Sequence, residues 1–328
     1  MLRIVFSSDD IARTRVAPAA DPVWETVLSL HLLQGRTREP SLAGWRGDVS
    51  EGLRRDVTAT TQLRLFSATN PSKGYFPDFL TPSESLHGLQ AGMDAIRSTP
   101  IERLNRDIAV LAEENALPPP AAALGRGEAE ALSQLTESME RYHSIAVAPY
   151  WSRIEAAVDA DRARRARTLL DGGAEGLLSG LRPKMRWNAG VLEVHDYPTE
   201  RDLHLDGRGL LLVPSFFCAR TPVALVDPAL PPVLVYPIDR LDGLARRGGG
   251  GQQALEALLG RTRAAVLEVV GDGCSTGEVA RRLRISPAAA SQHATVLRNA
   301  GLLATHRDRN TALHTLTPLG RAMLSAPF

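Results

Sequence analysis

The sequence predicts a mainly helical α+β protein: an N-terminal helical domain with a small β-sheet, followed by a smaller C-terminal domain. Helix-capping signals and helical periodicity fill most of residues 21–181. Between Leu192 and Ile238 the apolar residues instead recur with a period of two. The flexible segment RRGGGGQQ then precedes a strongly patterned C-terminal stretch. We therefore expect two domains, residues 1–247 and 254–328.

The N-terminal region carries its helix signals in order along the chain. LRIVF, residues 2–6, alternates as a short strand does. Asp21-Pro22 then caps the helix VWETVLSLHLLQ, Thr99-Pro100 starts IERLNRDIAVLAEEN, and a long amphipathic stretch runs from about residue 128 past residue 167. The proline-rich segments PSKGYFPDFLTP and LPPPAAALG are expected to break the chain between helices.

The period-two region predicts a small sheet. VLEVHDY, RDLHLDGRGLLLVPSFF and PPVLVYPID are expected strands. Asp206-Gly207 predicts a hairpin between two of them, because both residues tolerate the positive φ of a primed turn. GRGLLLVPSFF is continuously apolar, which is typical of a strand buried on both faces. Its Gly-Arg-Gly is not a nucleotide-binding fingerprint, since the third glycine is missing and no helix follows.

Composition excludes several classes of protein. The chain has 328 residues, of which 44% are hydrophobic, so it can bury a large core. It has no apolar run of the roughly 18 residues that a membrane helix needs, and MLRIVFSSDD does not resemble a signal peptide. We expect a cytoplasmic protein with no membrane partner. The two cysteines, Cys218 and Cys274, are expected to be packed or partly exposed thiols, and no cofactor is predicted.

Charge is unevenly distributed along the chain. From Ala254 onward there are nine Lys or Arg and five Asp or Glu, a balance of +4, whereas the preceding residues carry −3. A basic C-terminal domain is a weak indication of a polyanionic partner, because phosphate contacts supply most non-specific affinity for nucleic acids. An ordinary solvated surface explains a difference of this size equally well.

The C-terminal domain begins with helical periodicity and a capping signal. In ALEALLGRTRAAVLEVV the apolar residues recur at helical spacing, which predicts one buried face made of Leu255, Leu258, Leu259, Val266, Val269 and Val270. Ser275 and Glu278 fit a capping box, in which each side chain bonds the backbone amide of the other. A short helix to Leu283 follows, with Val279, Ala280 and Leu283 facing inward.

A second helix is predicted about three residues later, in RISPAAASQHATVLRNAGLL. Ser286 is the N-cap, Pro287 is the first helical residue, and Gly301 ends the helix in a left-handed conformation. This spacing makes the pair a helix-turn-helix candidate. At 100° per residue one face is apolar, and the opposite face is small and polar. The apolar face holds Ala290, Ala294 and Leu297; the polar face holds Ala288, Gln292, Thr295 and Asn299, with Ser291 and Arg298 alongside.

The polar face suits the major groove of DNA, which admits a helix with short side chains that bond base edges. Gln292 can bond adenine through two hydrogen bonds, and Ser291 and Thr295 can reach bases or phosphates. An ordinary surface helix is the alternative. LLATHRDRNTALHTL then predicts a β-hairpin, the wing of a winged helix, whose His306, Arg307 and Arg309 would lie against the DNA backbone or the minor groove. Arginines that solvate an exposed hairpin are the alternative there.

Residues 254–324 resemble the ArsR-type winged-helix transcriptional regulators. The resemblance rests on LLGRTRAAVLEVV, STGEVARRLRISPAAASQHATVLRNAGLL and LTPLGRAML, and continues in MLRIVFSSDDIARTRVAPAADPVWE, GRGLLLVPSFF and VLVYP, which resemble actinobacterial members with a long N-terminal domain. It implies a homodimeric DNA-binding repressor. It also places Ser286, Ser291, Gln292 and His293 on the helix that reads DNA. Because His293 lies toward the core side, we expect it, like His314, to be a structural histidine bonded to a backbone group.

The sequence departs from the metal-sensing members of this family. Metal-sensing members resemble one another in having either a Cys-x-Cys segment or Asp and His ligands on the last helix. At the corresponding positions this chain has the single Cys274, and LTPLGRAML contains neither Asp nor His. No metal site is expected. The wing loop reads Asp308-Arg309-Asn310 in place of the common Asp-Gly-Arg, so Asn310 would have to supply the positive φ.

These observations predict a regulator that binds a double-stranded DNA operator as a homodimer and responds to a small-molecule effector rather than to a metal. The N-terminal domain would bind the effector, form the dimer, or both; its aromatic residues either line a pocket or form plain core. The predicted DNA-binding residues are Ser286, Ala288, Ser291, Gln292, Thr295, Arg298, His306, Arg307 and Arg309.

Two alternatives remain open, an enzyme and a protein-interaction scaffold that use the winged helix for dimerisation. We do not predict an enzyme, because the chain has no Gly-rich phosphate loop, no Gly-x-Ser-x-Gly elbow and no His-Glu-x-x-His. The arginine-rich segment 161–167 could touch DNA, but a solvated helix face is the simpler interpretation.

Overall fold

The computed structural model describes the chain except residues 36–38, 220, 241–249, 272, 309–310 and 326–328. It also leaves undescribed the side chains of residues 40, 57–62, 250–254, 307–308, 311, 322 and 325. The chain divides into two compact units, Met1–Leu244 (unit 1) and Ala245–Phe328 (unit 2). Helices dominate both units and the sheets are small, so the protein has the mainly helical α+β character that the sequence predicts.

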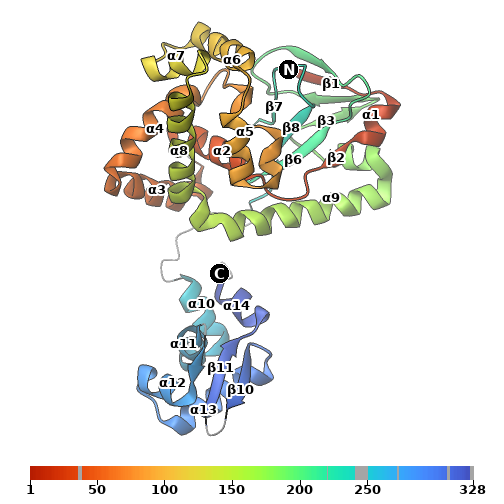
Figure 1. Ribbon diagram of the computed structural model, residues 1–328. Helices are drawn as coiled ribbons and strands as arrows, with labels where there is room; N and C mark the ends of the chain where they lie inside the picture. The colour runs from red at the N-terminus through yellow and green to blue at the C-terminus, as the bar shows by residue number, and fades with distance from the viewer. Residues whose placement is uncertain (36–38, 220, 241–249, 272, 309–310, 326–328) are drawn as a thin grey trace. The chain divides into compact units, whose positions relative to one another are not determined.

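Helices cover most of unit 1 between residues 22 and 179 (Figure 1). The helices of unit 1 are α1 (Ser8–Arg13), α2 (Pro22–Gln34), η1 (Pro40–Leu42), α3 (Ala43–Arg55), α4 (Val57–Thr69), η2 (Asp78–Leu80), η3 (Ser83–His87), α5 (Leu89–Arg97), α6 (Ile101–Glu114), α7 (Pro119–Gly125), α8 (Ala129–Ala146), η4 (Ala148–Tyr150) and α9 (Trp151–Ser179). The predicted cap of α2 is confirmed, because the Asp21 carboxylate accepts from the N–H groups of Val23 and Trp24 at 2.9 and 3.0 Å.

Two local predictions for the helical region are corrected. The segment LPPPAAALG was expected to break the chain, yet its last seven residues form α7 (Pro119–Gly125). Proline is compatible with the first helical turn, where its missing N–H has no partner in any case. Thr99 does not cap α6, since Pro100 is the N-cap residue and no side chain caps that helix.

The strands of unit 1 form two sheets, not the single small sheet that the sequence predicts. The first contains β1 (Leu2–Val5), β3 (Arg186–Asn188), β4 (Val191–Val194) and β5 (Arg201–His204), in the order β3-β4-β1-β5; β1 is antiparallel to β4 and parallel to β5. The second contains β2 (Arg15–Val16), β6 (Leu211–Ser215), β7 (Val223–Ala224) and β8 (Val233–Pro237), in the order β2-β6-β8-β7. Strand β6 is parallel to β2 and β8 and is largely buried, as its apolar run predicts.

The predicted hairpin at Asp206-Gly207 is wrong, although the turn itself is present. Both residues have positive φ, 52° and 78°, and the Arg208 N–H donates to the Leu205 carbonyl at 3.0 Å. The flanking strands β5 and β6 nevertheless belong to different sheets. At Gly209, where φ is 73°, a Cβ atom would lie 2.6 Å from the Arg13 side chain. The turn therefore carries the chain from one sheet to the other.

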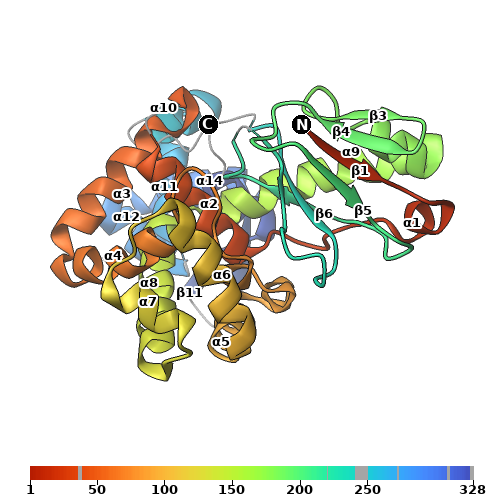
Figure 2. The ribbon, with the colours of Figure 1, turned by 90° about the horizontal axis from the view of Figure 1, so that it is seen from above.

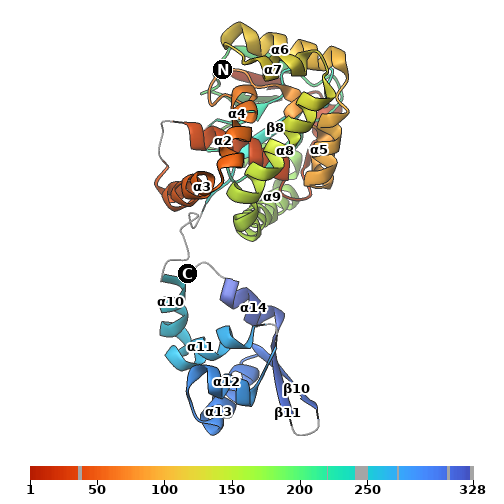
Figure 3. The ribbon, with the colours of Figure 1, turned by 60° about the vertical axis from the view of Figure 1, so that its left-hand side comes forward.

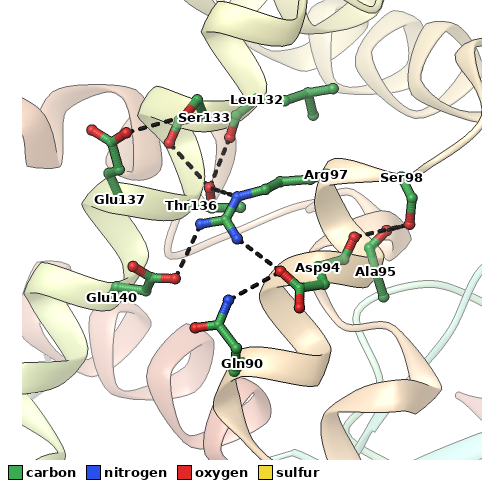
Figure 4. A network of polar contacts seen from close by, with 10 residues as sticks. All are labelled: Gln90, Asp94, Ala95, Arg97, Ser98, Leu132, Ser133, Thr136, Glu137 and Glu140. Atoms are coloured by element: carbon green, nitrogen blue, oxygen red, sulfur yellow. Dashed lines mark hydrogen bonds and ion pairs between the residues drawn. The ribbon is translucent and has the colours of Figure 1, made fainter.

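Within unit 1 the helices α2–α8 gather beside the strands, and the long helix α9 packs against β3 and β6 (Figures 1 and 2). The helices share a polar network at the junction of α5 and α8 (Figure 4). There the Arg97 guanidinium donates to Thr136 at 2.9 Å, to Asp94 at 2.9 Å and to Glu140 at 3.1 Å. One arginine thus satisfies polar groups on two packed helices.

Buried carboxylates connect the helices to the second sheet. Glu25 of α2 accepts hydrogen bonds from the Phe216 and Phe217 N–H groups at 2.7 and 2.9 Å and from the Ser215 hydroxyl at 3.0 Å. Asp78 of η2 accepts from the N–H groups of Val226 and Asp227 at 2.8 and 2.6 Å. These amides follow β6 and β7, where the sheet offers them no partner, so the carboxylates supply the acceptors that buried backbone requires.

The arginine-rich segment of α9 is structural in part. Asp161 is buried and pairs with Arg164 and with Arg165, which is itself buried. The Tyr236 hydroxyl of β8 donates to the same carboxylate at 2.6 Å. The sequence favours a solvated helix face here, but the structure shows a buried ion-pair network that attaches α9 to β8.

Unit 2 contains α10 (Gly250–Leu259), α11 (Arg261–Val270), β9 (Cys274–Ser275), α12 (Thr276–Leu283), α13 (Pro287–Asn299), β10 (Leu303–Asp308), β11 (Thr311–Leu316) and α14 (Pro318–Ser325). Its sheet has the order β10-β11-β9. The apolar stretch that predicts one buried helical face is divided at Gly260, where φ is 83°, into α10 and α11. Leu258 is consequently 61% exposed rather than buried, and β9 was not predicted.

Among the residues that the structure describes, no helix is both long and apolar enough to cross a membrane. Both cysteines are free and buried.

The Glu25 carboxyl yields a test of the junction between α2 and β6. Burial raises its pKa from 4.5 to about 7, since the charged form loses its hydration. The folded state therefore gains stability from Glu25 below pH 4.5, and this gain is lost as the pH rises through about 7. The thermal unfolding midpoint of the wild type, compared with that of Glu25→Gln, should decrease as the pH is raised from 5 to 8.

Tryptophan fluorescence measures this midpoint for unit 1, because all four tryptophans lie there. Glu155→Gln, which removes an exposed carboxylate on α9, is the control and should change the midpoint equally at every pH. A constant difference between wild type and Glu25→Gln across the pH range would contradict the prediction.

Candidate nucleic-acid interface

Helices α12 and α13 are joined by three residues, and each begins at a serine cap. Ser275 accepts a hydrogen bond from the Glu278 N–H at 3.2 Å, and Ser286 accepts one from the Ala289 N–H at 3.1 Å. Arg284 ends α12 in the left-handed region with φ of 53°, which reverses the chain sharply. The other hydrogen bond of the predicted capping box, from the Ser275 N–H to the Glu278 carboxylate, is not formed. That carboxylate pairs with Arg281 and Arg282 instead.

One face of α13 is buried against the rest of unit 2. Ala290, Ala294 and Leu297 are buried there, in the same cluster as Val279 and Ala280 of α12. Alanine at two of the three α13 positions lets the helix axes approach closely. Gly301 follows α13 with φ of 73°, as predicted for a left-handed C-terminal residue.

The opposite face of α13 is open to solvent. Ser286, Ala288, Ser291, Gln292 and Arg298 are exposed, and Thr295 is half-buried. The predicted site residues of this helix therefore lie together on one accessible surface. Short side chains allow close approach to a partner, while the hydroxyl and amide groups can donate and accept hydrogen bonds.

His293 does not behave as predicted. It is half-buried, and among the described residues its ring has no hydrogen-bond partner, so the expected bond to a backbone group is absent.

Strands β10 and β11 form an antiparallel hairpin that extends from the helices of unit 2 (Figure 3). Its innermost described pair is Asp308 with Thr311, and β9 adds a third strand beside β11. His306 is exposed, and Arg307 lies in β10 opposite Ala312, with its side chain among those not described. Arg309 and Asn310, including the predicted positive φ of Asn310, lie outside the described residues.

His314 joins the hairpin to α12. Its ring is buried, with Nε2 2.8 Å from the Thr276 hydroxyl and Nδ1 2.9 Å from the Thr305 hydroxyl. Burial, with the nearby charge of Arg298, lowers the pKa of the ring and keeps it neutral. The predicted structural role is confirmed, but the partners are two threonine side chains and not a backbone group. This histidine therefore sets the position of β11 relative to the first turn of α12.

Three arginines outside the predicted site residues directly precede α13 in the chain. Arg281, Arg282 and Arg284 are exposed at the end of α12 and in the following turn. The Glu278 carboxylate, which pairs with two of them, offsets only one of the three positive charges. The sequence signal for these arginines was the run RRLR, residues 281–284, which is separated from the Ser286 cap by one residue. The surface formed by these arginines and the exposed face of α13 is called the basic surface below.

The described residues contain no group of three or more His, Cys, Asp and Glu side chains that could hold a metal ion. Comparison with models of protein families, with curated proteins and with solved structures finds no match for this chain.

The role of His314 can be separated from that of the exposed His306 on the same hairpin. His314→Ala removes two buried side-chain hydrogen bonds, which should cost unit 2 on the order of 1–3 kcal/mol. Hydrogen exchange of the amides in β10, β11 and α12 should accelerate, while exchange in unit 1 stays unchanged. His306→Ala should leave the exchange as in the wild type, and equal effects of the two substitutions would exclude a joining role for His314.

Proposed function

We propose that unit 2 is a winged helix-turn-helix domain that binds double-stranded DNA, with α13 as the helix that enters the major groove and the β10–β11 hairpin as the wing. The observation that carries the proposal is the basic surface, where a narrow face of short polar side chains lies beside exposed arginines. A major groove about 12 Å wide admits such a helix, and the surrounding phosphates attract the arginines.

The side chains of the basic surface divide between two roles. Gln292, with Ser291 and Thr295 nearby, bonds base edges, because an amide can pair with adenine through both its oxygen and its nitrogen. Ala288 leaves room for the groove wall. Ser286 and Arg298, together with His306, Arg307 and Arg309 of the hairpin, contact the phosphates and fix the orientation of the domain.

The protein then acts in the cytoplasm as a sequence-specific transcriptional regulator, a repressor by its resemblance to the ArsR-type proteins. It responds to a small molecule bound in unit 1 rather than to a metal.

The protein binds DNA as a homodimer. Leu258 of α10 and Leu319 of α14 are 61% and 59% exposed, and they are apolar side chains that contact between two copies would cover.

Base reading by Gln292 is testable with a duplex selected by the wild-type protein from random sequences. Gln292→Ala should weaken binding to that duplex by about 1–3 kcal/mol and should change binding to an unrelated duplex little. The control is Gln134→Ala, which removes an exposed amide on α8 of unit 1 and should preserve the preference. Equal losses on both duplexes would refute base reading, and failure to select any duplex would favour the enzyme or scaffold alternatives.

Phosphate contact by Arg284 is testable from the salt dependence of binding. Arg284→Gln removes one positive charge from the basic surface, so the slope of log affinity against log salt should decrease by about one. Arg261→Gln removes an exposed charge on α11, outside the basic surface, and should leave the slope unchanged. Equal slopes for the wild type and Arg284→Gln would place Arg284 outside the interface.

A further inference from the structure

Unit 1 contains a cavity of about 200 Å³ between its helices and the second sheet. Residues of α2, α6, β6 and β8 contribute to its wall, together with residues 81–86 around η3. Most of the wall is apolar: Trp24, Leu86, Val213, Leu225 and Val233 all line it. The aromatic residues of the N-terminal domain were expected either to line a pocket or to form plain core, and Trp24 lines this cavity.

Arg103 is the positively charged residue in the described wall of this cavity, which also includes the acidic residues Asp21 and Glu84. Arg103 projects from α6, and its Nε atom is buried without a hydrogen-bond partner. In the described part of the chain, the only other buried side-chain nitrogen or oxygen without a partner is Nε2 of His143. Buried polar atoms are almost always bonded, whereas the guanidinium of Arg103 has no partner at Nε and its side chain lines the cavity. The wall therefore offers a cation to an acceptor that is not part of the protein.

The neighbouring carboxylates do not satisfy Arg103. Asp78 and Asp107 lie close enough for the arginine charge to favour their ionised forms and so oppose the rise that burial causes in their pKa values. Neither forms an ion pair with it; one oxygen of Asp78 accepts from the Val226 and Asp227 amides, and one oxygen of Asp107 accepts from the Phe79 amide at 3.0 Å. The donors of the guanidinium therefore remain available.

The acidic residues of the wall, Asp21 and Glu84, accept hydrogen bonds from groups other than Arg103. One oxygen of Asp21 accepts from the Val23 and Trp24 amides, and the other accepts from the Ser85 hydroxyl at 2.6 Å. Glu84 is exposed, and it accepts a hydrogen bond from the Ser83 hydroxyl at 3.2 Å. Arg103 is thus the one positively charged group among the described residues of the cavity wall, and it donates no hydrogen bond to the carboxylates there.

We propose that this cavity binds a small monocarboxylate whose apolar body, about the size of one six-membered ring, fills the space while its carboxylate bonds the Arg103 guanidinium. An apolar cavity of about 150 Å³ admits benzene, so 200 Å³ accommodates one ring and a carboxylate. A guanidinium presents two parallel N–H donors that match the two oxygens of a carboxylate. The binding site stands on the cavity alone, whereas its use as the effector site rests on the proposed function.

Titration calorimetry of the full chain without DNA tests the site, with benzoate as the probe and benzamide as its uncharged isostere. Benzoate should bind saturably at one site per chain, and benzamide should bind about tenfold to a hundredfold more weakly, since it lacks the charge-assisted hydrogen bonds. Equal affinities for the two probes, or no saturable binding of benzoate, would overturn the proposal.

Variants locate the binding. Arg103→Met should weaken benzoate binding by about tenfold or more, and Arg103→Lys, which keeps the charge but loses the paired donors, should weaken it less. Arg106→Met removes an exposed arginine from the same helix, one that pairs with Asp227 at 3.0 Å, and should bind benzoate as the wild type does. Circular dichroism establishes that each variant is folded. Unchanged binding by folded Arg103→Met would overturn the assignment, and the wild-type comparison of the two probes remains decisive if that variant does not fold.

A gel shift with and without benzoate addresses the effector role separately. Unchanged DNA binding would overturn that role and leave the carboxylate site standing. Benzoate binding by a protein that binds no DNA would instead refute the proposed function alone.

Discussion

The burial of one face of α13 is the constraint on which the candidate interface depends. A helix that packs Ala290, Ala294 and Leu297 against its neighbours must turn the residues between them toward solvent, because its period is fixed. Gln292 is exposed for that reason. The small buried side chains bring α12 close to α13, and the arginines at the end of α12 remain exposed. His314 ties the hairpin to the same helix.

Unit 1 is organised by a related requirement, that buried backbone amides find acceptors. Where the chain leaves β6 and β7, the carboxylates of Glu25 and Asp78 accept from amides that the sheet does not pair. Asp78 lies near Arg103 but forms no ion pair with it. The same arrangement that joins helices to sheet therefore leaves a cation with unused donors at the wall of a cavity.

Local features of the fold were predictable because their energies act within about one turn of chain. The caps at Asp21 and Ser286, the left-handed Gly301 and the positive φ at Asp206-Gly207 all depend on residues within four positions of each other. The hairpin assigned to Asp206-Gly207 failed because strand pairing is decided by distant segments. β5 pairs with β1 and β6 pairs with β2 and β8, which lie far away in sequence.

The sequence by itself determined where α12 and α13 begin and end and which side chains of α13 form its polar face, since cap chemistry and helical period are local properties. Only the tertiary structure decided that β9 joins the hairpin, that His314 bonds two threonines from different elements, and that Arg103 meets the cavity without a partner. Each of these depends on packing between segments separated by tens to more than a hundred residues, where no repeating pattern along the chain records which side chains will meet.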